Sequence, residues 1–84
     1  MQNFEIVVSD PVGIHARPAG MLVKEAQKLS SDITLMCRGK AADAKKLLAV
    51  MSLCAKCGDT LSVSVEGENE ISDAEKIKNL METL

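Results

Sequence analysis

The stretch TLSVSVEG, residues 60–67, alternates strictly between apolar and polar side chains. In an extended chain Leu61, Val63 and Val65 point to one side, and the serines between them point to the other. A strand of this kind keeps one face on a core and one face in water, which is typical of an antiparallel sheet covered on one side. The pattern therefore predicts a two-layer fold, with helices on one face of a sheet.

The rest of the chain supplies elements for both layers. Strands are expected at 4–8 and 33–37, and a tight turn at Gly39 leads into a short return strand at 40–44. Helical spacing of apolar residues predicts helices at 16–29 and 70–83, and the apolar run 46–53 is a third helix. The order is β-α-β-β-α-β-α, an α+β fold. The inner stripe expected for the last helix consists of Ile71, Ala74, Ile77, Leu80 and Met81.

Size and composition restrict the possible functions. A chain of 84 residues predicts one domain, residues 1–84, with a core too small to enclose a deep cavity as well. The net charge is −2 and Phe4 is the only aromatic residue, so nucleic-acid binding is disfavoured. The charge is uneven: residues 66–84 hold six acids and two lysines, and residues 1–65 hold six acids and eight bases. With no leader-like or membrane-spanning stretch, a cytoplasmic protein without membrane insertion is expected.

Three cysteines, an odd number, favour free thiols over a disulfide framework. Cys54 and Cys57 form the sequence CAKC, which could be redox-active or bind a metal. No second pair and no nearby histidine accompany them. We therefore expect buried or half-buried free thiols and no metal or cofactor.

The segment VGIHARPAG, residues 12–20, contains the single histidine of the chain. Pro18 fits a helix only in its first turn, so the helix must begin near residue 16, with His15 at its N-cap. The N-terminus of a helix favours an anion and the neutral form of an imidazole, and Arg17 adds a permanent positive charge. These features suit a phosphoryl group carried on His15. On residue types alone, a packing or capping histidine is an equally good interpretation, whereas a metal site has little support.

Several segments together resemble one family. GIHARPAG is similar to the active-site motif of HPr, the phosphocarrier of the bacterial phosphoenolpyruvate-dependent sugar phosphotransferase system. LVKEAQKLSSDITL, GKAADAKKLLAVMSL and GDTLSVSVEGENE resemble HPr in the same order and register. The likeness extends over essentially the whole chain.

The resemblance implies an open-faced β-sandwich of four antiparallel strands and three helices. It implies a monomeric covalent carrier rather than a turnover enzyme: His15 accepts a phosphoryl group at Nδ1 from enzyme I and passes it to a sugar-specific IIA domain. Arg17 would neutralise the phosphoryl charge. Two alternatives remain: a regulatory HPr-like protein, including one in a nitrogen-regulatory branch, that signals through the phosphorylation state of His15, and a thiol or metal protein that uses CAKC.

The run 46–53 has more large apolar residues than one short helix can bury. If Val50 and Leu53 point inward, an outer patch remains, and the resemblance places such a patch beside the active histidine, in contact with partners. Ordinary core packing is the alternative. The expected docking residues are Gly20, Lys24, Lys28, Leu47, Leu48 and Met51.

The chain departs from the family pattern at two positions. Lys46 stands where many HPr proteins have a regulatory serine, so control by a serine kinase is expected to be absent. A lysine there also adds a positive charge that we expect to strengthen docking to acidic partners. Cys54 stands where the family often has glycine.

Overall fold

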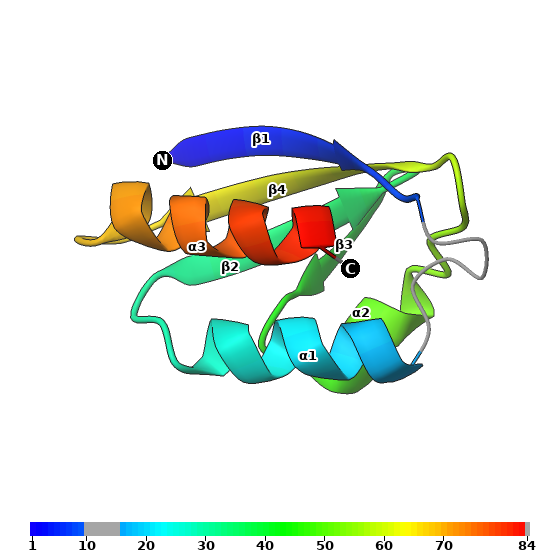
Figure 1. The fold of residues 1–84 in the computed structure, drawn as a ribbon, viewed down its shortest axis with the longest axis horizontal. Helices are drawn as coiled ribbons and strands as arrows, with labels where there is room; N and C mark the ends of the chain where they lie inside the picture. The colour runs from blue at the N-terminus through cyan, green and yellow to red at the C-terminus, as the bar shows by residue number, and fades with distance from the viewer. Residues whose placement is uncertain (10–15, 84) are drawn as a thin grey trace.

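The computed structural model describes residues 1–9 and 16–83, leaving out the side chains of residues 16–18 and 83. In the described chain, the strands and helices follow the predicted order β-α-β-β-α-β-α (Figure 1). The strands are β1 (Gln2–Val7), β2 (Asp32–Cys37), β3 (Lys40–Asp43) and β4 (Thr60–Glu66), and the helices are α1 (Ala16–Gln27), α2 (Leu47–Ser52) and α3 (Glu70–Thr83).

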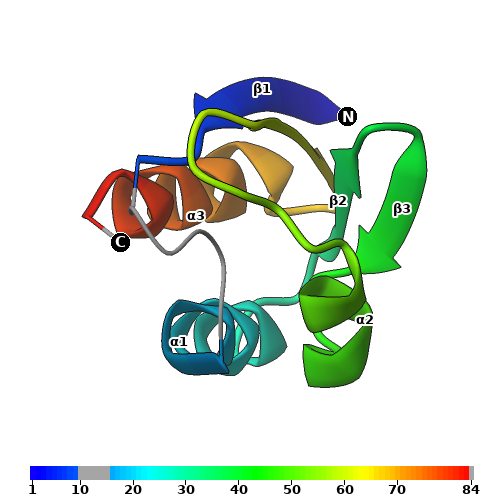
Figure 2. The ribbon, with the colours of Figure 1, turned by 90° about the vertical axis from the view of Figure 1, so that its right-hand side faces the viewer.

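The four strands form one antiparallel sheet in the order β1-β4-β2-β3. The three helices cover one face and leave the other open, so the predicted two-layer α+β fold is confirmed (Figure 2). β4 is central: Val63 pairs with Phe4 of β1 on one side and with Leu35 of β2 on the other. β1 begins at Gln2, two residues before the predicted start.

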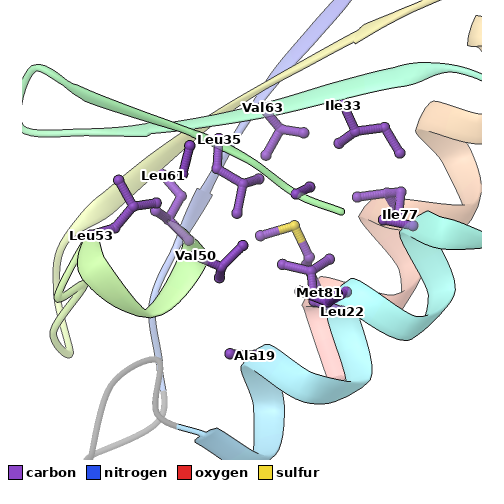
Figure 3. Packing of buried hydrophobic residues seen from close by; sticks show 14 of the residues in the cluster. Ala19, Leu22, Ile33, Leu35, Val50, Leu53, Leu61, Val63, Ile77 and Met81 are labelled. Atoms are coloured by element: carbon purple, nitrogen blue, oxygen red, sulfur yellow. The ribbon is translucent and has the colours of Figure 1, made fainter. Parts of the chain in front are cut away.

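The core lies between the sheet and the helices. Leu61, Val63 and Val65 of β4 are almost fully buried, as the alternation predicted. They meet apolar side chains of all three helices, which converge on the same layer (Figure 3). The labelled contributors from the helical layer are Ala19, Leu22, Val50, Leu53, Ile77 and Met81.

The stripe predicted for α3 is wrong at its first position. Ile71 is 71% exposed, whereas Asp73 is 4% exposed. Helix α3 turns Asp73 inward because its Oδ2 accepts hydrogen bonds from Ser31 N (3.2 Å) and Ser31 Oγ (2.6 Å). Rotation toward this buried pair leaves Ile71 facing solvent. The remaining prediction holds for Ala74, Ile77 and Met81, which are buried, and Leu80 is half-buried.

Two glycines have a specific role. Gly39, with φ +81°, and Arg38, with φ +49°, form the two-residue turn between β2 and β3, in which both central residues need positive φ. Gly67 has φ +158°, and a Cβ there would lie 3.0 Å from the backbone Cα of Ser31. Gly67 therefore lets the end of β4 approach the α1–β2 connection closely.

Candidate functional site

Helix α1 begins at Ala16, the residue that follows His15. This start agrees with the boundary predicted from Pro18. His15 itself lies outside the described residues; Arg17 is described only as the second residue of the helical backbone. No acidic residue stands in the first turn of α1. Within the helix itself, therefore, no first-turn carboxylate competes with an external anion for the N–H groups and the partial positive charge of this end.

The position of α1 is set by burial and by contacts with α2. Ala19, Leu22 and Ala26 are fully buried along its inner side. At its C-terminal end, Gln27 Nε2 donates to the carbonyl of Lys45 (2.8 Å), and Lys45 Nζ donates to the carbonyl of Leu29 (3.0 Å). These bonds join α1 to the residues that lead into α2, so the two helices lie side by side (Figure 2).

Helix α2 divides its apolar residues between the core and the surface. Val50 and Leu53 are buried, at 1% and 3% exposure. Leu47 is 40% exposed, Leu48 is 81% exposed, and Met51 is half-buried. The predicted outer patch is thus present, and its most exposed member is Leu48.

Helix α1 carries one exposed apolar residue that the sequence pattern did not single out. Met21 is 50% exposed and follows Gly20 on α1. Met21 precedes the buried Leu22 and lies outside the inner stripe of α1, so the helical spacing could have predicted its exposure. A Cβ added to Gly20 would meet nothing within 4 Å, so internal packing does not require glycine there.

Exposed basic residues lie on α1, just after it and at the start of α2. Lys24 is exposed on α1, and Lys28 is exposed in the turn that follows it, where its Nζ lies 3.8 Å from Glu25 Oε2. Lys46 is exposed at the N-cap of α2, with φ −120° and ψ 113°, and makes no side-chain capping bond. We define the α1–α2 surface as Gly20, Met21, Lys24, Lys28, Lys46, Leu47, Leu48 and Met51.

The expected burial of the CAKC thiols is wrong. Cys54 and Cys57 are both exposed, and only Cys37 is buried, although all three are free thiols. Cys54 follows the end of α2 with φ +52°, a left-handed conformation that accounts for the glycine expected in the family. Cys57 lies in the next turn, where its Sγ is 3.8 Å from the carbonyl of Ser9.

Within residues 1–9 and 16–83, no group of three or more potential ligand residues is placed to hold a metal ion. In the same part of the chain, every helix is too short or too polar to cross a membrane.

The comparisons with known proteins agree with the fold and with the motif. The family model described as PTS HPr component phosphorylation site matches residues 2–83. The phosphocarrier protein HPr of Haemophilus influenzae is 40% identical over 83 residues, covering 99% of this chain and 95% of that protein. The HPr of Mycoplasma capricolum is 36% identical over 81 residues, covering 96% and 91%.

Solved structures show the same arrangement. The histidine-containing phosphocarrier protein of a mycoplasma superposes with a TM-score of 0.92 at 35% identity, over 95% of this chain and 91% of that one. HPr from Thermoanaerobacter tengcongensis gives 0.92 at 32% identity, over 99% and 93%. The chain therefore belongs to the HPr family, the phosphocarrier proteins of the phosphotransferase system, which carry a phosphoryl group and are not catalytic enzymes.

Proposed function

We propose that His15 is the phosphoryl acceptor of this carrier. One observation carries the assignment: α1 begins at Ala16, directly after the only histidine. A group bound to that histidine is within reach of the positive end of a helix whose first turn holds no acid. In the family to which the chain belongs, phosphoryl transfer requires such a residue.

In the proposed transfer, the Nδ1 lone pair of neutral His15 attacks the phosphorus held by phospho-enzyme I. The new N–P bond forms as the bond from phosphorus to enzyme I breaks, and the electron pair of that bond returns to enzyme I. Transfer to a IIA domain repeats the exchange with His15 as the leaving group. Arg17 balances the charge of the phosphoryl oxygens during both steps.

The α1–α2 surface is the proposed docking site for both partners, enzyme I and a sugar-specific IIA domain. Leu48 and Leu47 supply an apolar centre, and Lys24, Lys28 and Lys46 supply a basic rim. This composition fits a partner with an apolar patch surrounded by carboxylates. Because Gly20 has no packing constraint in the chain, its lack of a side chain favours close approach by a partner.

The phosphoryl site is tested by mixing the protein with phosphoenolpyruvate and enzyme I and measuring its mass. We expect an acid-labile gain of one phosphoryl group in the native chain and none in His15→Ala. An undiminished gain in His15→Ala, with circular dichroism unchanged, would contradict the assignment.

The docking surface is tested with Leu48→Asp, which places a charge at the centre of the patch without disturbing the core. Its matched control is Ile71→Asp on α3, because Ile71 is similarly exposed. We expect the affinity for enzyme I to fall at least tenfold only in Leu48→Asp. Equal affinities of the two variants would exclude the patch as the docking site.

Lys46 is proposed to strengthen docking through its charge. Its backbone already begins α2 without a side-chain cap, so the side chain is available to a partner. Lys46→Glu should weaken binding of enzyme I or IIA, and the loss should shrink at high salt. An unchanged affinity would disprove this role.

We also propose a single-domain, cytoplasmic monomer. The family model matches residues 2–83, which supports one domain. A structure of the Thermoanaerobacter tengcongensis HPr as a dimer, at 32% identity and a TM-score of 0.77, makes the oligomeric state a question for experiment. Sedimentation of this chain as a dimer at micromolar concentration would contradict the monomer.

A further inference from the structure

The loop between α2 and β4, residues 53–59, supports the part of the chain that leads to His15. Val8 N donates to the carbonyl of Asp59 (2.8 Å), and Gly58 N donates to the carbonyl of Val8 (2.8 Å). Val8 is 4% exposed, and Cys57 Sγ lies beside the Ser9 carbonyl. The last described residues before the histidine segment therefore rest on this loop, at the end of the molecule where α1 begins (Figure 1).

Asp59 gives the loop its shape. Asp59 N donates to the carbonyl of Lys56 (2.9 Å), and Asp59 Oδ2 accepts from Lys56 N (2.8 Å). A turn closed from both directions has little freedom to move. The same residue supplies the carbonyl that binds Val8, so the turn and the support of Val8 depend on one position.

Arg38 attaches this loop to the sheet. From the β2–β3 turn, its Nη2 donates to the carbonyl of Cys54 (2.9 Å) and lies 3.5 Å from that of Leu53. Its Nη1 lies 3.4 Å from Asp59 Oδ2. One guanidinium thus contacts the chain just after α2 and the carboxylate that closes the turn. A planar group with five donors can make these contacts together.

We propose that Arg38 and Asp59 are positioning residues for phosphoryl transfer. They fix the 53–59 loop and, through it, Val8 and Ser9, from which the chain runs to His15. On the other side of His15, α1 is fixed by its buried residues, so the described chain is held both before and after the histidine segment. The proposal rests on His15 being the acceptor. It adds the requirement that the histidine be positioned for transfer, which binding at the docking surface alone does not provide.

The proposal is consistent with the demands of the reaction. Transfer needs the attacking nitrogen in line with the breaking bond, and a displacement of about 1 Å can lower a rate up to about a hundredfold. The clamp lies outside the α1–α2 surface. Its loss is therefore expected to lower the transfer rate at saturating partner and to leave partner binding unchanged.

The test is Arg38→Asn, measured as phosphoryl transfer from phospho-enzyme I over a range of carrier concentrations. Asn followed by Gly39 is the best pair for this type of turn, so the variant should fold at least as stably. It lacks the guanidinium. We expect kcat to fall about three- to tenfold with KM unchanged. Asp59→Asn keeps an oxygen acceptor for Lys56 N but loses the charge, so its kcat should fall by a smaller factor.

Two controls separate geometry from charge and stability. Lys40→Gln removes one positive charge from the same hairpin, where Lys40 is exposed, and should leave kcat unchanged. Arg38→Lys keeps the charge but replaces the planar guanidinium with a single ammonium group, and should recover part of the lost rate. A native kcat in Arg38→Asn, a loss confined to KM, or an equal loss in Lys40→Gln would each overturn the positioning role.

His15→Ala, run in the same assay, distinguishes failure of this proposal from failure of the function on which it rests. If His15→Ala accepts no phosphoryl group while Arg38→Asn transfers at the native rate, only the positioning role is refuted. If His15→Ala is phosphorylated as fully as the native chain, the acceptor assignment fails and the positioning role fails with it.

Discussion

The two ends of the long axis of the molecule are held together by different chemistry (Figure 1). At one end, the buried Ser31 donates twice to the buried carboxylate of Asp73, next to the close contact at Gly67. At the other end, Arg38 and Asp59 form a clamp with the guanidinium side chain 52% exposed. Both arrangements join segments distant in sequence, but only the first is shielded from water.

The difference distinguishes an end whose contacts stabilise the fold from an end where the proposed positioning residues lie. Removing a buried acceptor leaves its donors without a hydrogen-bond partner and out of reach of water, which lowers the free energy of unfolding substantially. An exposed ion pair is screened by solvent and contributes little to the free energy of unfolding. We therefore expect the Arg38–Asp59 clamp to act on geometry, and the Ser31–Asp73 contacts to keep the fold together.

The largest expected effect is that of Asp73→Ala. Its removal leaves the N–H and the hydroxyl of Ser31 unpaired in the core, so the free energy of unfolding should fall by about 3 kcal/mol. Urea denaturation measures this loss. The folded fraction should still accept a phosphoryl group at the native rate. A loss below about 1 kcal/mol would break the contrast between the two ends.

Gly67→Ala should destabilise the same end by about 2 kcal/mol, because the new Cβ would meet the Ser31 backbone at 3.0 Å in a strained conformation. Gly20→Ala is the matched control. Its Cβ has open space within α1, so thermal denaturation should show a gain of up to about 1 kcal/mol. The same sign for both substitutions would contradict the packing described for Gly67.

At the end that holds Arg38 and Asp59, Cys54→Gly should stabilise the protein by about 1 kcal/mol, because glycine adopts the left-handed conformation without steric cost. Urea denaturation of Cys54→Gly beside Cys57→Ser, which has no such strain, measures the difference. A destabilised Cys54→Gly would show that the cysteine side chain supports the loop.

The smallest effect is the coupling between Arg38 and Asp59. A double-mutant cycle of Arg38→Asn and Asp59→Asn should give a coupling free energy of about 0.5 kcal/mol, and 1 M salt should reduce it. A coupling above about 2 kcal/mol would make this end as important for stability as the Ser31–Asp73 end.

The sequence predicted the layers and the order of elements because apolar spacing reports which side of a strand or helix is buried. Leu61, Ala74 and Ile77 all lie where their spacing placed them. It misplaced Ile71 because hydropathy cannot anticipate that a carboxylate such as Asp73 will be buried by hydrogen bonds from a residue 42 positions away. The exposure of Cys54 and Cys57 depends on where the loop runs after α2, which residue type does not determine.

The candidate site shows the same division. The start of α1 at Ala16 followed from Pro18, a local constraint. The exposed Leu48 followed from the excess of apolar residues in a short helix. The Arg38 clamp could not be predicted, since it joins a hairpin turn to a loop at separations of 15, 16 and 21 residues through backbone carbonyls and one carboxylate that carry no sequence signal.

The central place of β4 has a consequence for synthesis of the chain. β1 and β2 do not pair with each other; each pairs with β4, which begins only at Thr60. A nascent chain that ends before that residue has no strand to join them. The edge of β2 that holds Ile33 and Leu35 then has no neighbouring strand on that side. The four-stranded sheet therefore cannot close before Thr60–Glu66 has been synthesised, and until then β1 and the β2–β3 hairpin remain separate.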